Sequence, residues 1–141
     1  MRPIDILLVE DNPGAVRLTR EALRDEGVRT RLHVAADGEE AMAFLRNEGG
    51  FSQAPRPDLI LLDLNLPGKK GSEVLAEVKS DPELQRIPVV VLTTSEDQAD
   101  ISAAYGYHAN GYITKPVDLE EFLRAVRAIE EFWFRTVRLP R

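Results

Sequence analysis

Cysteine is entirely absent from this chain of 141 residues. The protein therefore has no disulfide, no thiolate metal site and no cysteine nucleophile. Long apolar runs are also missing, since none approaches the roughly 18 residues that would span a bilayer. The first residues lead into an apolar run that is short and is soon interrupted by an acid, so they do not form a signal peptide. We therefore expect a cytoplasmic protein that makes no contact with a membrane.

Basic residues are scarcer than acidic ones, with 18 lysines and arginines against 24 aspartates and glutamates, for a net charge of −6. Because proteins that bind a phosphate backbone normally carry a basic stripe, we expect no nucleic-acid partner. The length favours one domain, 1–141, large enough to bury a core without a covalent staple. We find no repeat or linker, and we expect no second domain after the final helix.

Apolar runs and helical patterns alternate along the chain five times. Runs without internal alternation indicate strands buried on both faces, as in a parallel sheet. The pattern predicts an α/β protein with a doubly wound five-stranded parallel sheet and five helices. The predicted strands are 4–9, 30–35 (near the sheet's edge), 59–62, 88–93 and 111–114. The first four predicted helices run from 13 to a closing Gly27, from 37 to 45, from 71 to about 81, and from a cap at Ser95 or Asp97 to about 107. The fifth starts after a cap at Asp118.

A polar side chain follows most of the predicted strands at the carboxyl end. Asp63 ends the run 59–62, and the following Pro67-Gly68 pair suits a type II turn. Carboxyl ends of parallel strands share one edge of an open sheet, where such folds bind ligands. The side chains expected to meet there are Glu10, Asp11, Asp63, Thr93 and Lys115.

The expected cluster has a definite chemistry. Three crowded carboxylates repel one another, so they must take up protons or bind a cation. Oxygen ligands of high charge suit a hard ion such as Mg²⁺. Lys115 would add a compact positive charge suited to a phosphate. A carboxylate beside Mg²⁺ and lysine can act as a nucleophile toward a phosphoryl group, with positioning and charge neutralisation supplying most of the catalysis.

These residues resemble the signature of a response-regulator receiver domain over nearly the whole chain. The resemblance implies a flavodoxin-like sheet with strand order 2-1-3-4-5 and a phosphorylation-controlled switch. Such a protein modifies only itself, so we do not expect a turnover enzyme. The matching residues are Glu10-Asp11, Asp63, Asn65, Pro67, Gly71, Thr93 and Lys115-Pro116.

The resemblance also implies a role for each matching position. Asp63 would accept a phosphoryl group from the phosphohistidine of a sensor histidine kinase. Asp11 and Asp63 would ligate Mg²⁺, together with the backbone carbonyl of Asn65. Glu10 would hold a metal-bound water. Asn65 and Ser95 would flank the water that later removes the phosphoryl group.

Further roles concern the switch. Lys115 would pair with the phosphate, and Thr93 would donate its hydroxyl to a phosphate oxygen. Tyr112 would swing inward as Thr93 moves. The family usually has a cis peptide bond at the position of Lys115 and Pro116, which proline makes affordable.

Softer features resemble the single-domain receivers that partner bacterial phytochromes, which implies a phytochrome-type kinase. These features are the start 10–13, the loop 51–56, the segments 92–95 and 108–110, and the Phe132-Trp133 pair.

The final helix and its tail, about 118–141, carry more apolar surface than one receiver domain can cover. Either the tail folds back on its own domain, or two copies pair through the last helix, and we expect the symmetric homodimer. The stripe expected to pack on the sheet is Leu119, Phe122, Leu123, Val126, Ile129 and Trp133. The second stripe is Ala125, Ala128 and Phe132, extended by Phe134, Val137 and Leu139.

Two other functions compete with the receiver. A phosphatase of the haloacid-dehalogenase type also uses an aspartate nucleophile beside Mg²⁺, but it needs a second acid where this chain has Asn65. A binding module whose acidic pocket no longer takes phosphate is the second alternative. The intact Asp63, Thr93 and Lys115 weigh against it.

Overall fold

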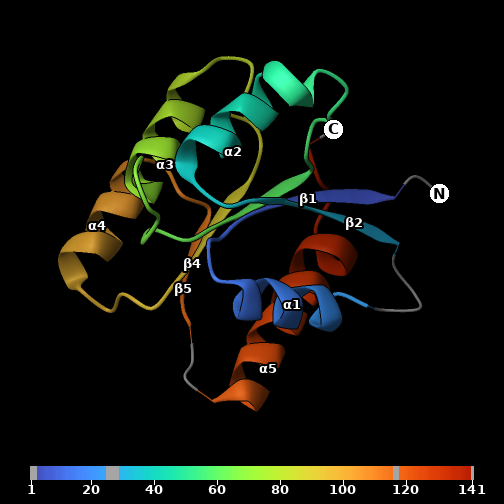
Figure 1. The fold of residues 1–141 in the computed structure, drawn as a ribbon. Coiled ribbons are helices and arrows are strands. Elements are labelled where there is room, and N and C mark those ends of the chain that lie inside the picture. The colour runs from blue at the N-terminus through green and yellow to red at the C-terminus, as the bar shows by residue number, and fades with distance from the viewer. Residues whose placement is uncertain (1–2, 25–28, 116–117, 141) are drawn as a thin grey trace.

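The computed structural model describes residues 3–24, 29–115 and 118–140. Strands and helices alternate along these residues, as predicted (Figure 1). The strands are β1 Ile4–Val9, β2 Thr30–Ala35, β3 Leu59–Leu62, β4 Val89–Thr93 and β5 Gly111–Thr114. The helices are α1 Pro13–Ala22, α2 Gly38–Leu45, α3 Gly71–Ser80, α4 Gln98–Gly106 and α5 Leu119–Glu130.

The five strands form one parallel sheet in the order β2-β1-β3-β4-β5, which confirms the expected topology and places β2 at an edge. The register fixes which strand ends are neighbours. Val9 at the end of β1 pairs with Leu62 at the end of β3, and Thr93 pairs with Thr114. The residues that follow these strand ends therefore start from adjacent positions on one edge.

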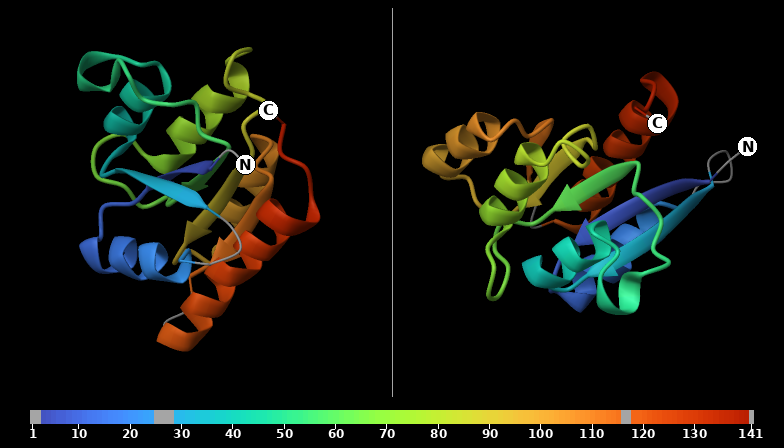
Figure 2. Two further views of the ribbon diagram at one scale, coloured as in Figure 1. Left: turned by 90° about the vertical axis from the view of Figure 1, so that its right-hand side faces the viewer. Right: turned by 90° about the horizontal axis from the view of Figure 1, so that it is seen from above.

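Helices cover both faces of the sheet, with α1 and α5 on one side and α2, α3 and α4 on the other (Figures 1 and 2). Alternate residues of each strand point to opposite faces, so β1 contributes to two separate cores. Ile6 and Leu8 pack with α1 and α5, whereas Leu7 and Val9 pack with α2 and α3. This arrangement explains why the strand sequences are apolar at every position.

Polar side chains start four of the helices at the predicted places. Asn12, Asp37 and Asp118 each accept hydrogen bonds from amides in the first turn of their helix. Of the two candidates for the cap of α4, Asp97 holds the position, accepting from the amide of Ala99 at 2.9 Å. Ser95 lies in the loop before α4, and its hydroxyl donates to the carboxylate of Asp100.

Two expected boundaries differ from the structure. Helix α1 ends at Ala22, and the predicted closing residue, Gly27, lies outside the described residues. The segment 49–57, whose polar sequence rich in glycine and proline predicts a loop without regular structure, begins with a short 3₁₀ turn, Gly49–Phe51. The aromatic ring of Phe51 packs edge-on against Phe44 of α2, with 5.6 Å between ring centroids.

The last helix departs from the predicted stripe at its first residue. Phe122, Val126 and Ile129 are buried against the sheet, but Leu119 is 52% exposed, so its predicted packing is wrong. The first turn of α5 extends beyond the carboxyl ends of the strands, where no sheet remains to cover Leu119 (Figure 1). None of the helices in the described ranges is long and apolar enough to cross a membrane.

Beyond α5 the chain continues as a π-helical turn, Glu131–Thr136, and then as an extended tail. Trp133, Phe134 and Leu139 are partly buried against the same core as α5, so this part of the tail folds back on its own domain. Phe132 remains 49% exposed.

Candidate functional site

Three carboxylates meet at the carboxyl edge of the sheet, as the sequence predicts. The amide of Asp63 donates to the carbonyl of Val9 at 3.0 Å, which extends the β1–β3 pairing by one residue and places Asp63 beside the end of β1. Glu10, Asp11 and Asp63 each offer an oxygen within 4.8 Å of the others. Glu10 and Asp63 are buried, whereas Asp11 is exposed.

Lys115 reaches into this cluster from the end of β5. Its ammonium donates to Asp63 Oδ2 at 3.0 Å and to Glu10 Oε1. Its backbone amide donates to the carbonyl of Thr93 at 2.6 Å, which fixes the base of the side chain beside β4. The lysine is thus anchored by one strand and paired with the ends of two others.

The charges at this edge do not balance, because three carboxylates share one ammonium. Burial raises the pKa of Glu10 in spite of its hydrogen bond with Lys115, and the nearby charge of Asp63 adds to the increase. Burial alone would lower the pKa of Lys115, but its hydrogen bonds to Glu10 and Asp63 outweigh burial and raise it. A set of hard oxygen donors with excess negative charge fits a divalent cation.

The loop after Asp63 is built around the acceptor position. The amide of Asn65 donates to Asp63 Oδ1 at 2.9 Å and holds that carboxylate in place. Gly68 has φ 67, the positive value that a type II turn requires at this position. A Cβ on Gly71 would collide with the backbone carbonyl of Asp63, so only glycine lets α3 begin this close to the loop.

The predicted switch residues lie on the two neighbouring strands β4 and β5. Thr93 is fully buried, and the side-chain amide of Asn65 lies 3.4 Å from its hydroxyl and 3.3 Å from that of Thr94. Tyr112 is partly buried, and its hydroxyl donates to the carbonyl of Ser95 at 2.9 Å. Burial and the surrounding acids raise the pKa of Tyr112.

Asp100 lies near the site, and nothing in the sequence indicated its contact there. The hydroxyl of Ser95, expected to flank the attacking water, donates to the carboxylate of Asp100 at 2.5 Å. Acids in the first turn of a helix are common, so Asp100 carries no signal in the sequence.

The expected cis bond between Lys115 and Pro116 lies outside the described residues.

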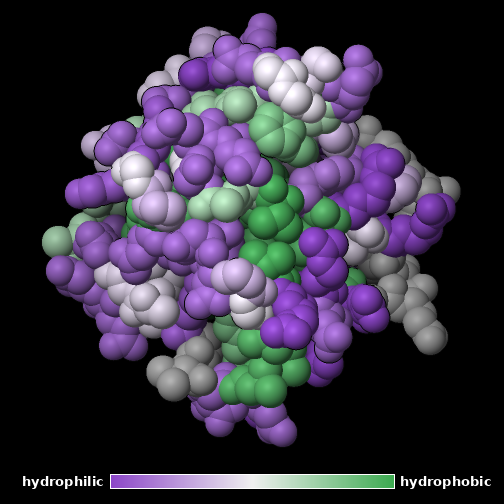
Figure 3. All heavy atoms as spheres, in the orientation of Figure 1, coloured by the Kyte–Doolittle hydropathy of each residue, from purple (hydrophilic) through white to green (hydrophobic). Residues whose placement is uncertain are grey.

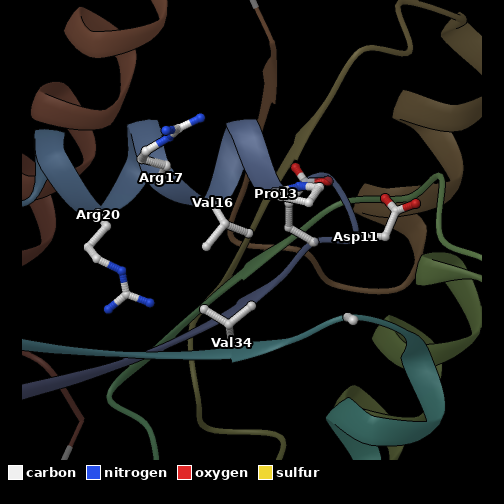
Figure 4. Close-up of a pocket in the computed structure, with 8 residues that line it drawn as sticks. Asp11, Pro13, Val16, Arg17, Arg20 and Val34 are labelled. Carbon is white, nitrogen blue, oxygen red and sulfur yellow. The ribbon is translucent and has the colours of Figure 1, made fainter.

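A groove beside the acidic cluster opens between α1 and β2 (Figure 4). Its volume is about 350 Å³, with Val16 and Val34 facing each other across it and Arg20 extending along one end. Asp11 lies at the opposite end, so the groove leads to the carboxylates. In the space-filling view, hydrophobic surface is visible down the middle of the face that carries α1, β2 and α5 (Figure 3).

A second polar cluster lies at the amino edge of the same sheet. The buried carboxylate of Asp5 receives two hydrogen bonds from Arg31, at 2.8 and 2.9 Å, and lies 3.0 Å from His33 Nε2. The backbone amide of Asp5 donates to Asp58 Oδ2 at 2.9 Å. Burial favours the neutral acid, but Arg31 and His33 outweigh it and lower the pKa of Asp5.

The fold and the site together define a class of protein. Residues 6–127 match the response regulator receiver domain family, and the chain belongs to that family. It is the receiver domain of a two-component response regulator, which makes a sensor histidine kinase the implied class of partner.

Individual relatives match over almost the full length. Response regulator Rcp1 of Synechocystis sp. is 51% identical over 138 residues, which cover 98% of this chain and 94% of that protein. A structure of the phosphorylated cyanobacterial phytochrome response regulator RcpA matches with a TM-score of 0.97 and 54% identity, over 99% of this chain and 100% of the other. The Mn²⁺-bound form of Rcp1 matches with a TM-score of 0.95 and 50% identity, over the same shares.

Proposed function

We propose that Asp63 accepts a phosphoryl group from the phosphohistidine of a sensor histidine kinase. The observation that carries this proposal is the contact between Lys115 Nζ and Asp63 Oδ2, at 3.0 Å, inside a cluster of three carboxylates. The contact supports the proposal because it joins the carboxylate of Asp63 to an ammonium beside two further carboxylates at one edge of the sheet. Glu10 and Asp11 complete the acidic set from the neighbouring strand end.

The transfer moves one phosphoryl group between two side chains. The phosphorus–nitrogen bond of the kinase's phosphohistidine breaks, and a phosphorus–oxygen bond to a carboxylate oxygen of Asp63 forms. The kinase imidazole leaves with the electron pair and takes up a proton. Lys115 neutralises charge on the transferred group, and the hydroxyl of Thr93 donates to one of its oxygens.

Mg²⁺ is the proposed cofactor of this site. Bound there, it would neutralise negative charge on the carboxylates and on the phosphoryl oxygens. The ligands would be Asp11, Asp63 and the backbone carbonyl of Asn65, while Glu10 would hold a metal-bound water. The hard, all-oxygen donor set supports this assignment.

Phosphorylation would act by biasing a two-state equilibrium. Thr93 would move toward the new phosphoryl group, and Tyr112 would follow because both residues border the loop after β4. The output would be a changed surface on β4, β5 and the helices beside them. The chain would act as a single receiver domain. It would catalyse only its own phosphorylation and dephosphorylation and would not be a turnover enzyme.

A phytochrome-type kinase is the proposed partner. Support comes from the likeness over nearly the whole chain to RcpA, which is described as a phytochrome response regulator. Since histidine kinases draw their phosphate from cytoplasmic ATP, we place the protein in the cytoplasm. Neither a nucleic acid nor a membrane is proposed as a partner, in keeping with the net charge of −6.

A homodimer through the C-terminal helix and tail is also proposed. The exposed ring of Phe132 stacks edge-on with Trp133, with 5.3 Å between centroids, and the pair offers an aromatic surface to a second copy. Light scattering at micromolar concentration should give the mass of a dimer, and Phe132→Ala should shift it toward the monomer. A wild-type protein that stays monomeric at that concentration would rule the dimer out.

The phosphoacceptor is tested by transfer from a purified, autophosphorylated phytochrome kinase to wild type and to Asp63→Asn. The wild type should gain the label in the presence of Mg²⁺, and Asp63→Asn should gain none. Asn differs from Asp by one atom in the side chain, so the fold is retained, which circular dichroism checks. Equal labelling of the two proteins would refute the assignment of Asp63.

A further inference from the structure

The loop between β4 and α4 is held at one residue from two directions. The side chain of Ser95 donates to the carboxylate of Asp100 in α4 at 2.5 Å. The backbone carbonyl of the same residue accepts from the hydroxyl of Tyr112 in β5 at 2.9 Å. Ser95 therefore joins a helix and a strand that flank the loop, two residues after the buried Thr93.

Helix α4 has few other attachments. Among its nine residues, Gln98–Gly106, only Ala104 is buried, and Tyr105 is 51% exposed. The helix lies at one side of the layer formed with α2 and α3 (Figure 1). A helix with so little buried surface follows whatever holds its first turn, because packing alone does not fix its position.

We propose that Asp100 is a positioning residue that couples α4 to the acceptor site through Ser95. Displacement of Thr93 would carry the adjoining loop, and the Ser95–Asp100 hydrogen bond would transmit that displacement to the first turn of α4. The inference rests on the proposed function, since the displacement begins with phosphorylation of Asp63. It adds the specific bond through which this chain moves α4.

The coupling differs from ordinary helix capping. The N-cap of α4 is Asp97, whose carboxylate accepts from the amide of Ala99 at 2.9 Å. Asp100 holds a side chain of the preceding loop instead. Its charge also favours the helix dipole, so a test must separate the hydrogen bond from the charge. Asp100→Asn does so, because it removes the charge and keeps an oxygen that can accept from Ser95.

The test measures amide chemical shifts of α4 by NMR before and after addition of Mg²⁺ and acetyl phosphate. Wild type and Asp100→Asn should show the same shift changes in residues 98–106. Asp100→Ala should shift the equilibrium of α4 toward its position in the unphosphorylated protein on the order of fivefold, the effect of losing one ordinary hydrogen bond. Ser95→Ala should match it, and the double variant should be no worse than either single one.

Asp97→Ala serves as the matched control, since it removes the cap and leaves the Ser95–Asp100 bond in place. It should fray α4 in both states without abolishing the response. If Asp100→Ala responds like the wild type, or if Asp97→Ala loses the response equally, the coupling role is refuted. Label on Asp63 is quantified in every sample. An unlabelled wild type would refute the proposed function itself, whereas normal labelling with a wild-type response in Asp100→Ala would refute only the coupling.

Discussion

The two edges of the sheet place buried aspartates in opposite situations. At the amino edge, both carboxylate oxygens of Asp5 receive hydrogen bonds from the guanidinium of Arg31, with His33 beside one of them. At the carboxyl edge, Asp63 shares a single ammonium, that of Lys115, with a second buried carboxylate and lies near a third. The carboxylate of Asp5 is paired with the guanidinium of Arg31, whereas Asp63 lies in a cluster with an excess of negative charge.

Under the proposed function, this difference distinguishes a structural acid, Asp5, from a reactive one, Asp63. A carboxylate that is fully paired gains nothing from a metal or a phosphoryl group and stabilises the fold. A carboxylate in a cluster with surplus charge needs a cation, and the cation in turn makes phosphoryl transfer favourable. Burial does not separate the two, since Asp5 is 3% exposed and Asp63 is 7% exposed.

The largest expected effect comes from removing the divalent cation. With a chelator present, labelling of the wild type by acetyl phosphate should fall to background, because the excess charge then repels the incoming donor. Asp11→Asn should approach the same result with Mg²⁺ present, whereas Asp5→Asn should label normally. Undiminished labelling under chelation, measured by intact-protein mass spectrometry, would contradict the contrast between the edges.

Lys115→Ala should have the next largest effect. Removing the ammonium leaves all three acids, so Mg²⁺ binding, followed by titration calorimetry, should remain largely intact. The phosphoryl group would lose its fixed partner, and the change at Tyr112 should be uncoupled from phosphorylation. Chemical-shift changes at Tyr112 identical to those of the wild type would show that Lys115 has no part in the switch.

Asp5→Asn should reduce stability and leave the reaction alone. The variant loses hydrogen bonds to a charged side chain, and we expect the free energy of unfolding to fall by roughly 1–3 kcal/mol in urea titrations. Asp58 keeps its hydrogen bond to the backbone amide of residue 5 in this variant. Unchanged stability together with impaired labelling would reverse the roles assigned to the two edges.

The same pair of proteins gives the smallest and most specific effect, a dependence on pH. The pKa of Asp5 is lowered in the folded state, so its contribution to stability is complete above the unfolded value of about 4. It is lost as pH falls through the lower, folded value. The stability difference between wild type and Asp5→Asn should therefore hold from pH 5 to about 4 and shrink below that. A difference that grows with acidity would contradict it.

The sequence was sufficient for the sheet order and for the acidic cluster because strand ends of a parallel sheet must share an edge. Asp63 and Lys115 could be brought together from 52 residues apart by that rule alone. The amino-edge cluster could not be predicted, because Asp5 and His33 interrupt apolar runs without any motif. Their contact depends on the register of β1 with β2, which pairs Asp5 with Arg31.

Other features depended on packing that the sequence does not encode locally. Leu119 fits the apolar stripe of α5 by periodicity, but the sheet ends before it, and length of overlap is a tertiary property. The bond between Ser95 and Asp100 joins a loop to a helix across five residues, and its existence depends on the path of the loop. Sequence patterns predict well which side of a helix or strand is buried, and they predict poorly how far one element extends past another.

The most direct test of the account is the location of the phosphoryl group after treatment of the wild type with Mg²⁺ and acetyl phosphate. Reductive trapping of the acyl phosphate, followed by peptide mass spectrometry, identifies the modified residue. We expect modification at Asp63 alone, with Asp5 and Asp58 untouched. Modification at Asp11, at the amino edge, or at no residue in the presence of Mg²⁺ would contradict it.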